Sequence, residues 1–364
     1  MRALPRIRHT LAVTLTVIAP QFIAPQFAAP ASAQPVPRAD RLFYYVDREA
    51  SWDSFVKHVD QIGIVGPQSF SVDSLGVVFG EVDPALIKLA AQHGVKVMPL
   101  VVNENFNQVE LHKLLVDSTA RMRAIDALVA LCQRDRYWGI QFDIEDVSIA
   151  DKDRFTNWYQ AASHALRGAG FHISIAVVPR AGDLAGPTAY NRWMFDSWRG
   201  GYDLAALGNA SDFVSWMTYD EHTRRTPPGP VAGLPWMTAS VDYALRFIPA
   251  GKLSLGVPLY GTHWFVQADP LSPLRAGVSG ASVSNAWGVH IMERAGGRIQ
   301  WDDVQKVSYG SAMVGDINEW VYLDDARSFA AQTDLARAKK LRGFSAWVLG
   351  TEDARIWDAL PAGQ

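Results

Sequence analysis

Short apolar segments recur along the chain, and amphipathic stretches with helical spacing separate most of them. These segments are nearly continuous apolar runs, which is typical of strands buried on both faces of a parallel sheet. The predicted strands are Leu42–Val46, Ser69–Val72, Val95–Val102, Gly139–Ile144, His172–Val178, Phe213–Thr218, Leu253–Tyr260 and Gly343–Val348. The predicted helices include Pro84–Gln92, Ser118–Gln133, Asp151–Arg167, Leu234–Phe247 and Ala326–Lys340. Eight such units over roughly 320 residues predict an α/β fold, a (β/α)8 or TIM barrel.

One region departs from this alternation. From about residue 263 to about residue 320 the chain is rich in Gly, Ser and Pro, with short strand-like pieces and no convincing long helix. We interpret this region as a small α+β insertion after the seventh strand, beside the C-terminal mouth of the barrel. A further hairpin strand is predicted at Leu75–Phe79. A doubly wound open sheet is the alternative architecture, but no glycine-rich phosphate loop follows the first strand.

The first 33 residues do not belong to the predicted barrel. Three arginines lie within the first eight positions, an apolar run spans Leu11–Ala19, and Ala31, Ser32 and Ala33 form an A-x-A cleavage site. The apolar run is short for a membrane span. We therefore predict a signal peptide at residues 1–33, a barrel domain at residues 34–364, and export to the periplasm or the cell exterior. An uncleaved membrane anchor is the alternative.

Composition narrows the function. The chain is 49% hydrophobic and 20% charged, which is typical of a globular protein with a large core. Cleavage after residue 33 removes three arginines and no acid, so the net charge changes from −3 to −6. This balance argues against nucleic acid as a partner and against a polybasic membrane patch. Cys132 is the only cysteine, so no intrachain disulfide can form, and we expect a packed core thiol.

The most informative segment is the fourth predicted strand. Gln141, Asp143 and Glu145 occupy alternate positions and therefore share one face of a strand, whereas the intervening apolar residues share the other. Two neighbouring acids on a buried strand cost several kcal/mol in desolvation and repulsion unless a site uses them. Because reactive groups of such barrels lie at the C-terminal ends of strands, this pattern predicts a catalytic acid.

Other predicted strand ends carry aromatic and polar residues as well. The additional candidates for substrate binding are Tyr45, Asn103, Met217, Tyr219, Asp220, Tyr260 and Trp347. Of the neighbours Tyr44 and Tyr45, one is expected in the core because adjacent strand residues face opposite ways. Trp236, Trp264, Trp301 and Trp320 are either sugar platforms or core residues. A pocket with aromatic walls and clustered acids suits a carbohydrate, and we expect no metal ion or cofactor.

Four motifs in order extend this picture. They are Met217–His222 (MTYDEH), Pro228–Trp236 (PGPVAGLPW), Gly256–Gly261 (GVPLYG) and Gly343–Gly350 (GFSAWVLG). With them the chain resembles the chitinase-like glycoside hydrolase family 18 from Tyr44 to Trp357. It is most similar to bacterial members that act on peptidoglycan, including spore-cortex-lytic N-acetylglucosaminidases. The family signature D-x-x-D-x-D-x-E keeps its last two acids here, whereas Trp138 and Gln141 occupy its first two acidic positions.

The resemblance implies a role for each matching residue. Glu145 would be the general acid, with a pKa raised by nearby Asp143. Asp143 would orient the 2-acetamido group of the substrate, whose oxygen is the nucleophile in this family. Tyr219 would hydrogen-bond that oxygen, Asp220 would bind the distorted sugar, and Trp347 would form the floor beneath it. Gln141 would hydrogen-bond Asp143 without raising its pKa by like charge.

The resemblance also implies a substrate. We expect a monomeric, retaining hydrolase of β-1,4 bonds after N-acetylglucosamine, acting on an N-acetylglucosamine-containing polysaccharide. Peptidoglycan is the preferred polymer, and chitin or chito-oligosaccharides are the alternative. A catalytically silent carbohydrate-binding relative is a third possibility, which the glutamine at position 141 favours.

Overall fold

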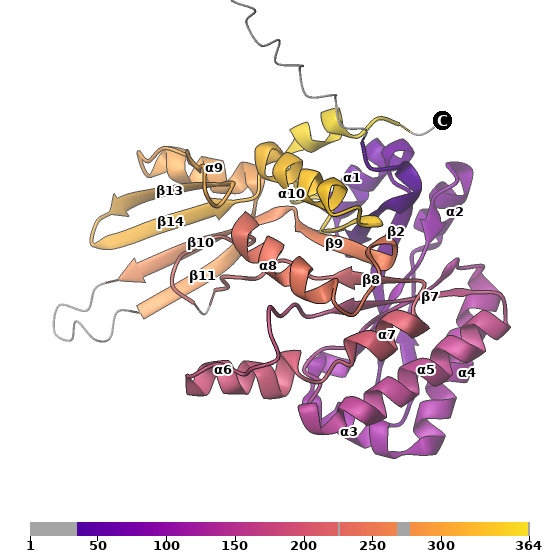
Figure 1. Ribbon diagram of the computed structural model, residues 1–364. Coiled ribbons are helices and arrows are strands. Elements are labelled where there is room, and N and C mark those ends of the chain that lie inside the picture. Colours follow the sequence, from indigo (N-terminus) through magenta and orange to yellow (C-terminus); the bar gives the residue numbers. More distant parts are fainter. Residues whose placement is uncertain (1–34, 225, 268–276, 363–364) are drawn as a thin grey trace, which may run out of the picture. The chain divides into compact units, whose positions relative to one another are not determined.

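The structure is a computed structural model that describes residues 35–224, 226–267 and 277–362 (Figure 1). Its main sheet is a closed ring of eight parallel strands, so the predicted TIM barrel is confirmed. The predicted signal peptide, residues 1–33, lies outside the described residues. No helix within the described ranges is long and apolar enough to span a membrane.

The barrel strands follow one another around the ring. They are β1 (Arg41–Tyr45), β2 (Ile64–Val72), β5 (Leu100–Asn103), β6 (Gly139–Asp143), β7 (His172–Val177), β8 (Phe213–Trp216), β9 (Leu253–Pro258) and β15 (Gly343–Trp347). Strand β15 pairs in parallel with β1 and thereby closes the ring. A short piece, β4 (Lys96–Val97), pairs with β2 just before β5. The predicted hairpin is present as β3 (Val78–Gly80), antiparallel to β2.

Helices cover the outside of the ring. They are α1 (Glu49–His58), α2 (Pro84–Gln92), α3 (Gln108–Val116), α4 (Ser118–Asp135), α5 (Lys152–Gly168), α7 (Leu204–Ala210), α8 (Leu234–Ala244) and α10 (Ala326–Ala338). The short helix α6 (Ala189–Met194) buries none of its residues. Aspartate side chains cap several of them; Asp83, for example, accepts from the backbone N–H of Ala85 at the start of α2. Cys132 of α4 is fully buried, as expected, and burial raises its pKa to about 12.

The two faces of β6 explain how the barrel presents its polar residues. Phe142 packs edge-on against Trp158 and Tyr159 of α5, at ring-centroid distances of 5.3 and 5.2 Å. Its apolar neighbours on the same face are completely buried. The alternate residues Gln141 and Asp143 therefore project into the interior of the ring, because successive strand side chains point to opposite faces.

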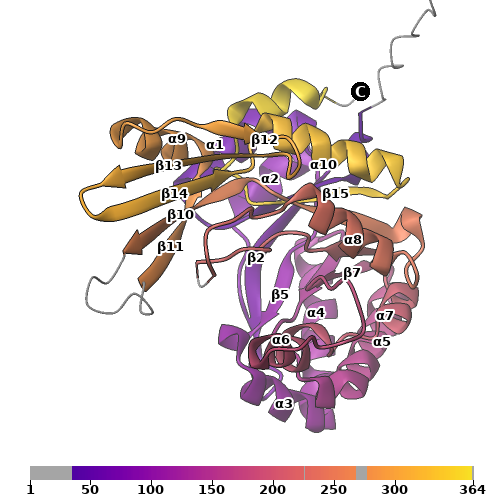
Figure 2. The ribbon, with the colours of Figure 1, turned by 60° about the vertical axis from the view of Figure 1, so that its left-hand side comes forward.

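A second sheet follows the seventh barrel strand (Figure 2). Its antiparallel strands are β10 (Tyr260–Gln267), β11 (Gly277–Ser284), β12 (Gln300–Asp302), β13 (Val307–Val314) and β14 (Ile317–Leu323). The predicted insertion is therefore confirmed in position, although it spans residues 260–323 rather than 263–320. Strand β10 begins two residues after β9, so Tyr260 stands at the junction of the insertion and the barrel.

The prediction that the insertion lacks a long helix is wrong. Helix α9 (Asn285–Arg294) has ten residues, and its N-cap Ser284 accepts from the backbone N–H of Trp287. Gly288 lets the helix approach the sheet, since a Cβ there would lie 2.4 Å from Leu323 Cδ2. Met292 is the only large side chain of α9 that is buried. A helix with so narrow an apolar face gives too weak a periodic signal to predict.

Candidate active site

A cavity of about 250 Å³ opens at the C-terminal ends of the barrel strands. Its walls combine acids with tyrosine, tryptophan and apolar side chains. The lining residues are Tyr44, Gln68, Leu100, Phe106, Asp143, Glu145, Ala176, Met217, Tyr219, Asp220, Tyr260 and Trp347. The Tyr44 and Trp347 rings lie 5.4 Å apart between centroids and meet at the point where β1 and β15 close the barrel.

The chain leaving β6 is clamped in place. Asp143 is the last residue of the strand, and Glu145 follows just outside it. Asn103 at the end of β5 accepts from the Glu145 N–H and donates to the Glu145 carbonyl, both at 3.0 Å. From the opposite side, the Tyr202 hydroxyl donates to the Ile144 carbonyl at 2.8 Å. These contacts fix the peptide on both sides of Glu145 and so define where its carboxyl group can lie.

The acids of the cavity hold their protons more tightly than in water. Burial raises the pKa of Asp143 to about 6, and a hydrogen bond from Gln68 Nε2 at 3.5 Å opposes this shift. The pKa of Glu145 is raised well above its ordinary value, first by burial and then by the charges of Asp143, Asp220 and Asp146. The direction agrees with the expectation from sequence, but desolvation rather than Asp143 is the main cause. Glu145 is therefore suited to donate a proton at neutral pH.

Gln141 does not line the cavity, and its expected hydrogen bond to Asp143 is absent. Its amide nitrogen donates to the hydroxyls of Ser174 and Ser215, at 2.9 and 3.0 Å. Ser215 in turn shares a hydrogen bond with Ser345, and Ser345 shares one with Ser254. Gln141 thus belongs to a buried polar layer inside the barrel. The sequence did not reveal this layer because its serines come from four different strands.

Three buried oxygens next to this layer have no hydrogen-bond partner within the described residues: Tyr44 Oη, Gln141 Oε1 and Asp143 Oδ1. Burial raises the pKa of the Tyr44 hydroxyl as well as that of the Asp143 carboxyl group. The Tyr44 hydroxyl therefore stays neutral beside the polar layer.

Tyr219, Asp220 and Tyr260 form another part of the cavity wall. The Tyr260 hydroxyl donates to Asp220 Oδ1. Asp220 adopts a left-handed backbone conformation with φ of 60°, and although the residue is exposed, desolvation of its carboxyl group raises its pKa. Burial also raises the pKa values of Tyr219 and Tyr260 well above their ordinary value. Both hydroxyls therefore remain neutral hydrogen-bond donors.

Seven of the ten predicted site residues line the cavity: Asp143, Glu145, Met217, Tyr219, Asp220, Tyr260 and Trp347. Gln141 lies beneath it, and Asn103 braces the backbone of Glu145 instead of lining it. Of the two neighbouring tyrosines, Tyr44 lines the cavity, whereas Tyr45, the predicted substrate-binding residue, packs against Phe55 of α1. None of the four candidate tryptophans lines the cavity, and Trp264 is completely buried.

Sequence reasoning missed four lining residues: Gln68, Leu100, Phe106 and Ala176. Strand β2 begins at Ile64, whereas the prediction started it at Ser69 and so left Gln68 outside the strand. A polar residue within an apolar β run was the available signal. Phe106 is the last residue of a short 3-10 helix, Glu104–Phe106, and has a φ of 50°, so no periodic sequence pattern marks it.

Comparisons with known proteins agree with this geometry. The family model described as glycosyl hydrolases family 18 matches residues 44–352. The uncharacterized glycosylase YvbX of Bacillus subtilis (strain 168) is 25% identical over 326 residues, which cover 88% of this chain and 90% of that protein. The cortical fragment-lytic enzyme of the same strain is 28% identical over 257 residues, covering 70% of this chain. The chain spans only 56% of that enzyme's length.

A solved structure is similar over nearly the whole described chain. The crystal structure of a chitinase from Chromobacterium violaceum ATCC 12472 aligns with a TM-score of 0.77 and 26% sequence identity. The alignment covers 88% of this chain and 96% of that chain. The similarity therefore includes both the barrel and the insertion.

Substitution of Asn103 tests the clamp on Glu145. Asn103→Ala removes two hydrogen bonds and leaves the Glu145 peptide unpaired, so we expect the free energy of unfolding to fall by about 1–3 kcal/mol. Urea unfolding followed by circular dichroism measures this loss. Asn157→Ala, at an exposed position of α5, is the control and should change stability by less than about 0.5 kcal/mol. Equal stability of the two variants would contradict the clamp.

Proposed function

Because the chain belongs to glycosyl hydrolase family 18, we propose that it cleaves β-1,4 bonds after N-acetylglucosamine with retention of configuration. The observation that carries the proposal is the pair of a buried Asp143 and a half-buried Glu145, which line one cavity with aromatic walls. Glu145 has the raised pKa that proton donation to a glycosidic oxygen requires. The function of a silent carbohydrate-binding protein does not require such an acid.

The first step uses Glu145 and the substrate's own acetamido group. Glu145 donates its proton to the glycosidic oxygen, and the bond from that oxygen to the anomeric carbon breaks. The acetamido oxygen of the same sugar attacks the anomeric carbon and forms a positively charged oxazolinium ring. Glu145, now ionised, then takes a proton from water as the water opens this ring. Two displacements at one carbon retain its configuration.

The remaining cavity residues stabilise this intermediate. Asp143 accepts the acetamido N–H and, when ionised, balances the positive charge of the ring. The neutral hydroxyl of Tyr219 donates to the acetamido oxygen, and Asp220, held by Tyr260, binds a sugar hydroxyl. Trp347 supplies an apolar surface for the sugar ring.

We propose peptidoglycan as the polymer. Support comes from the similarity to the cortical fragment-lytic enzyme, whereas the similarity to the Chromobacterium violaceum chitinase favours chitin as the second candidate. Peptidoglycan lies outside the cytoplasm. We therefore propose that the protein is exported, in keeping with the basic, apolar and A-x-A segments of residues 1–33.

Substitution of Glu145 tests the general acid. Glu145→Gln keeps the shape of the side chain but cannot donate a proton, so we expect kcat on a fluorogenic N-acetylglucosamine oligomer to fall by about 10²–10⁴-fold. Oligomer binding, measured by calorimetry, should survive. Glu221→Gln is the matched control: Glu221 accepts from the Gly233 N–H, and a glutamine oxygen can do the same. Hydrolysis by Glu145→Gln at the wild-type rate would remove Glu145 from this role.

The dependence of kcat/KM on pH tests the roles of Asp143 and Glu145. The acidic limb should fall below about pH 6, because protonation of Asp143 removes the charge that balances the intermediate. The alkaline limb should lie above the ordinary range of glutamate because the pKa of Glu145 is raised. Gln68→Leu removes the hydrogen bond that lowers the pKa of Asp143, so its acidic limb should move to higher pH. An acidic limb that stays in place in this variant would contradict the assignment to Asp143.

Substrate digests test the polymer and the nucleophile separately. Mass spectrometry of digested peptidoglycan should show products with N-acetylglucosamine at their reducing ends. Release from chitin alone would overturn peptidoglycan and leave the mechanism intact. Glycans stripped of their N-acetyl groups should resist cleavage, and equal rates on stripped and intact glycans would overturn the acetamido mechanism.

A further inference from the structure

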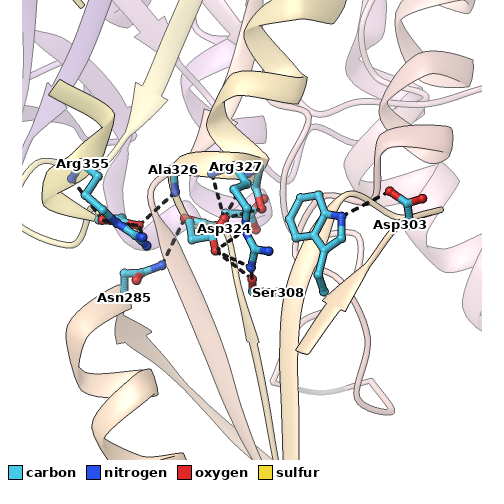
Figure 3. A network of polar contacts seen from close by, with 11 residues as sticks. Asn285, Asp303, Ser308, Asp324, Ala326, Arg327 and Arg355 are labelled. Atoms are coloured by element: carbon cyan, nitrogen blue, oxygen red, sulfur yellow. Dashed lines mark hydrogen bonds and ion pairs between the residues drawn. The ribbon is translucent and has the colours of Figure 1, made fainter. Parts of the chain in front are cut away.

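A buried acid lies where the insertion rejoins the barrel. Asp324 directly follows β14, and the preceding residue, Leu323, pairs with Gly261 next to Tyr260. The Asp324 carbonyl accepts from Asn285 Nδ2 at the start of α9. Figure 3 shows the polar network at this junction. Asp324 thus stands at the root of the insertion, close enough for a negative charge on it to raise the pKa of Tyr260.

Asp324 and its neighbour Asp325 differ in the hydrogen-bond donors that contact them. Asp325, which is 5% exposed, caps α10 and accepts from the backbone N–H groups of Arg327 and Ser328 and from the Ser308 hydroxyl. The Arg327 guanidinium also contacts it at 3.2 Å. An ionised carboxylate suits this set of donors.

Asp324, which is 3% exposed, receives a single side-chain hydrogen bond, from Gln332 Nε2 of α10 to its Oδ1 at 2.6 Å. The other oxygen of each partner, Asp324 Oδ2 and Gln332 Oε1, is buried and has no partner within the described residues. Both oxygens are acceptors if Asp324 is ionised, so both would lose their hydrogen bonds to water without replacement. One proton on Oδ2 changes this, because it turns that oxygen into a donor, for which the unpaired Gln332 Oε1 is the available acceptor.

The surroundings of Asp324 also favour its protonated, neutral state. Burial raises the pKa of Asp324 well above its ordinary value, and the negative charges of Asp325 and Glu221 add to this shift, whereas the hydrogen bond from Gln332 opposes it. The third ionisable group that faces it is Tyr260, which is neutral. Arg327, the next cation along the chain, is engaged by Asp325 and Ser308.

We propose that Asp324 is a neutral carboxylic acid, joined to Gln332 by two hydrogen bonds, and that this acid–amide pair positions the root of the insertion against α10. Tyr260 is the first residue of β10, which starts at this root, and its hydroxyl donates a hydrogen bond to Asp220 in the cavity. Asp324 is thus a positioning residue for the wall that carries Asp220. The catalytic readout of this proposal rests on the proposed function, whereas its stability readout does not.

Asp324→Asn is the decisive variant. The asparagine amide supplies an N–H in place of the acid's O–H and keeps the oxygen that accepts from Gln332, so both bonds can form without a proton. In the wild type, the unfolded chain releases the Asp324 proton near the ordinary pKa of aspartate while the folded protein keeps it. Wild-type stability therefore falls as pH rises from about 4 toward the folded pKa. The asparagine variant lacks this loss.

We expect the Tm of Asp324→Asn to match the wild type near about pH 4 and to exceed it by a margin that grows toward about pH 8. Asp325→Asn, the matched control one residue away, should lower Tm at neutral pH because it removes a paired, ionised cap. Asp324→Leu should lower Tm at every pH. Differential scanning calorimetry of the full chain measures all three.

Two results would overturn the proposal. If Asp324→Asn lowers Tm as Asp325→Asn does, Asp324 is an ionised carboxylate. If its effect on Tm is independent of pH, a donor other than a proton serves Oδ2. In the catalytic test, Asp324→Leu should have a higher KM for an N-acetylglucosamine oligomer than the wild type. Asp324→Asn should have the KM of the wild type. An inactive wild type with the expected Tm pattern would refute only the proposed function.

Discussion

Withdrawal of carboxyl groups from water at the mouth of the barrel is the constraint on which the rest of the site depends. Burial is the largest cause of the raised pKa of Asp143, Glu145 and Asp220. No ion pair in the described part of the chain involves any of the three. They are held instead by uncharged groups, such as the Gln68 amide and the Tyr260 hydroxyl. A lysine or arginine in contact would favour ionisation, whereas neutral donors fix position and leave the proton available.

The availability of hydrogen-bond donors also distinguishes the two neighbouring aspartates at the root of the insertion. Asp324 and Asp325 are adjacent and almost equally buried, yet one faces a single amide and the other faces a helix N-terminus and a guanidinium. The two carboxyl groups therefore differ in the number of hydrogen-bond donors that they receive, although their side chains are equally withdrawn from water. In the barrel interior, the polar layer around Gln141 uses serine hydroxyls and contains no charge.

Much of this arrangement could be predicted from the sequence, and each failure has a physical reason. Strict alternation on β6 placed Asp143 and Glu145 correctly because apolar and polar residues took opposite faces. All five residues of β1, Arg41 included, are buried, and the predicted strand began only at Leu42, so no exposed polar position distinguished the face of Tyr44 from that of Tyr45. Asn103 was assigned to substrate because its position at a strand end is informative, whereas its bonds to a backbone peptide leave no trace in residue type. Helix α9 escaped prediction because glycine replaces a large apolar side chain at its contact with the sheet.

The pairing of the first barrel strand with the last carries a consequence for biogenesis. Arg41 donates to the carbonyl of Pro361 across 320 positions of the chain, and the aromatic floor formed by Tyr44 and Trp347 spans the same seam. The cavity has no floor until the final strand docks, so a nascent or truncated polypeptide has no assembled catalytic centre. Contacts of such long range slow folding, because the entropy of loop closure is lost before the contacts form. The enzyme's cutting activity thereby depends on synthesis of the chain at least as far as β15.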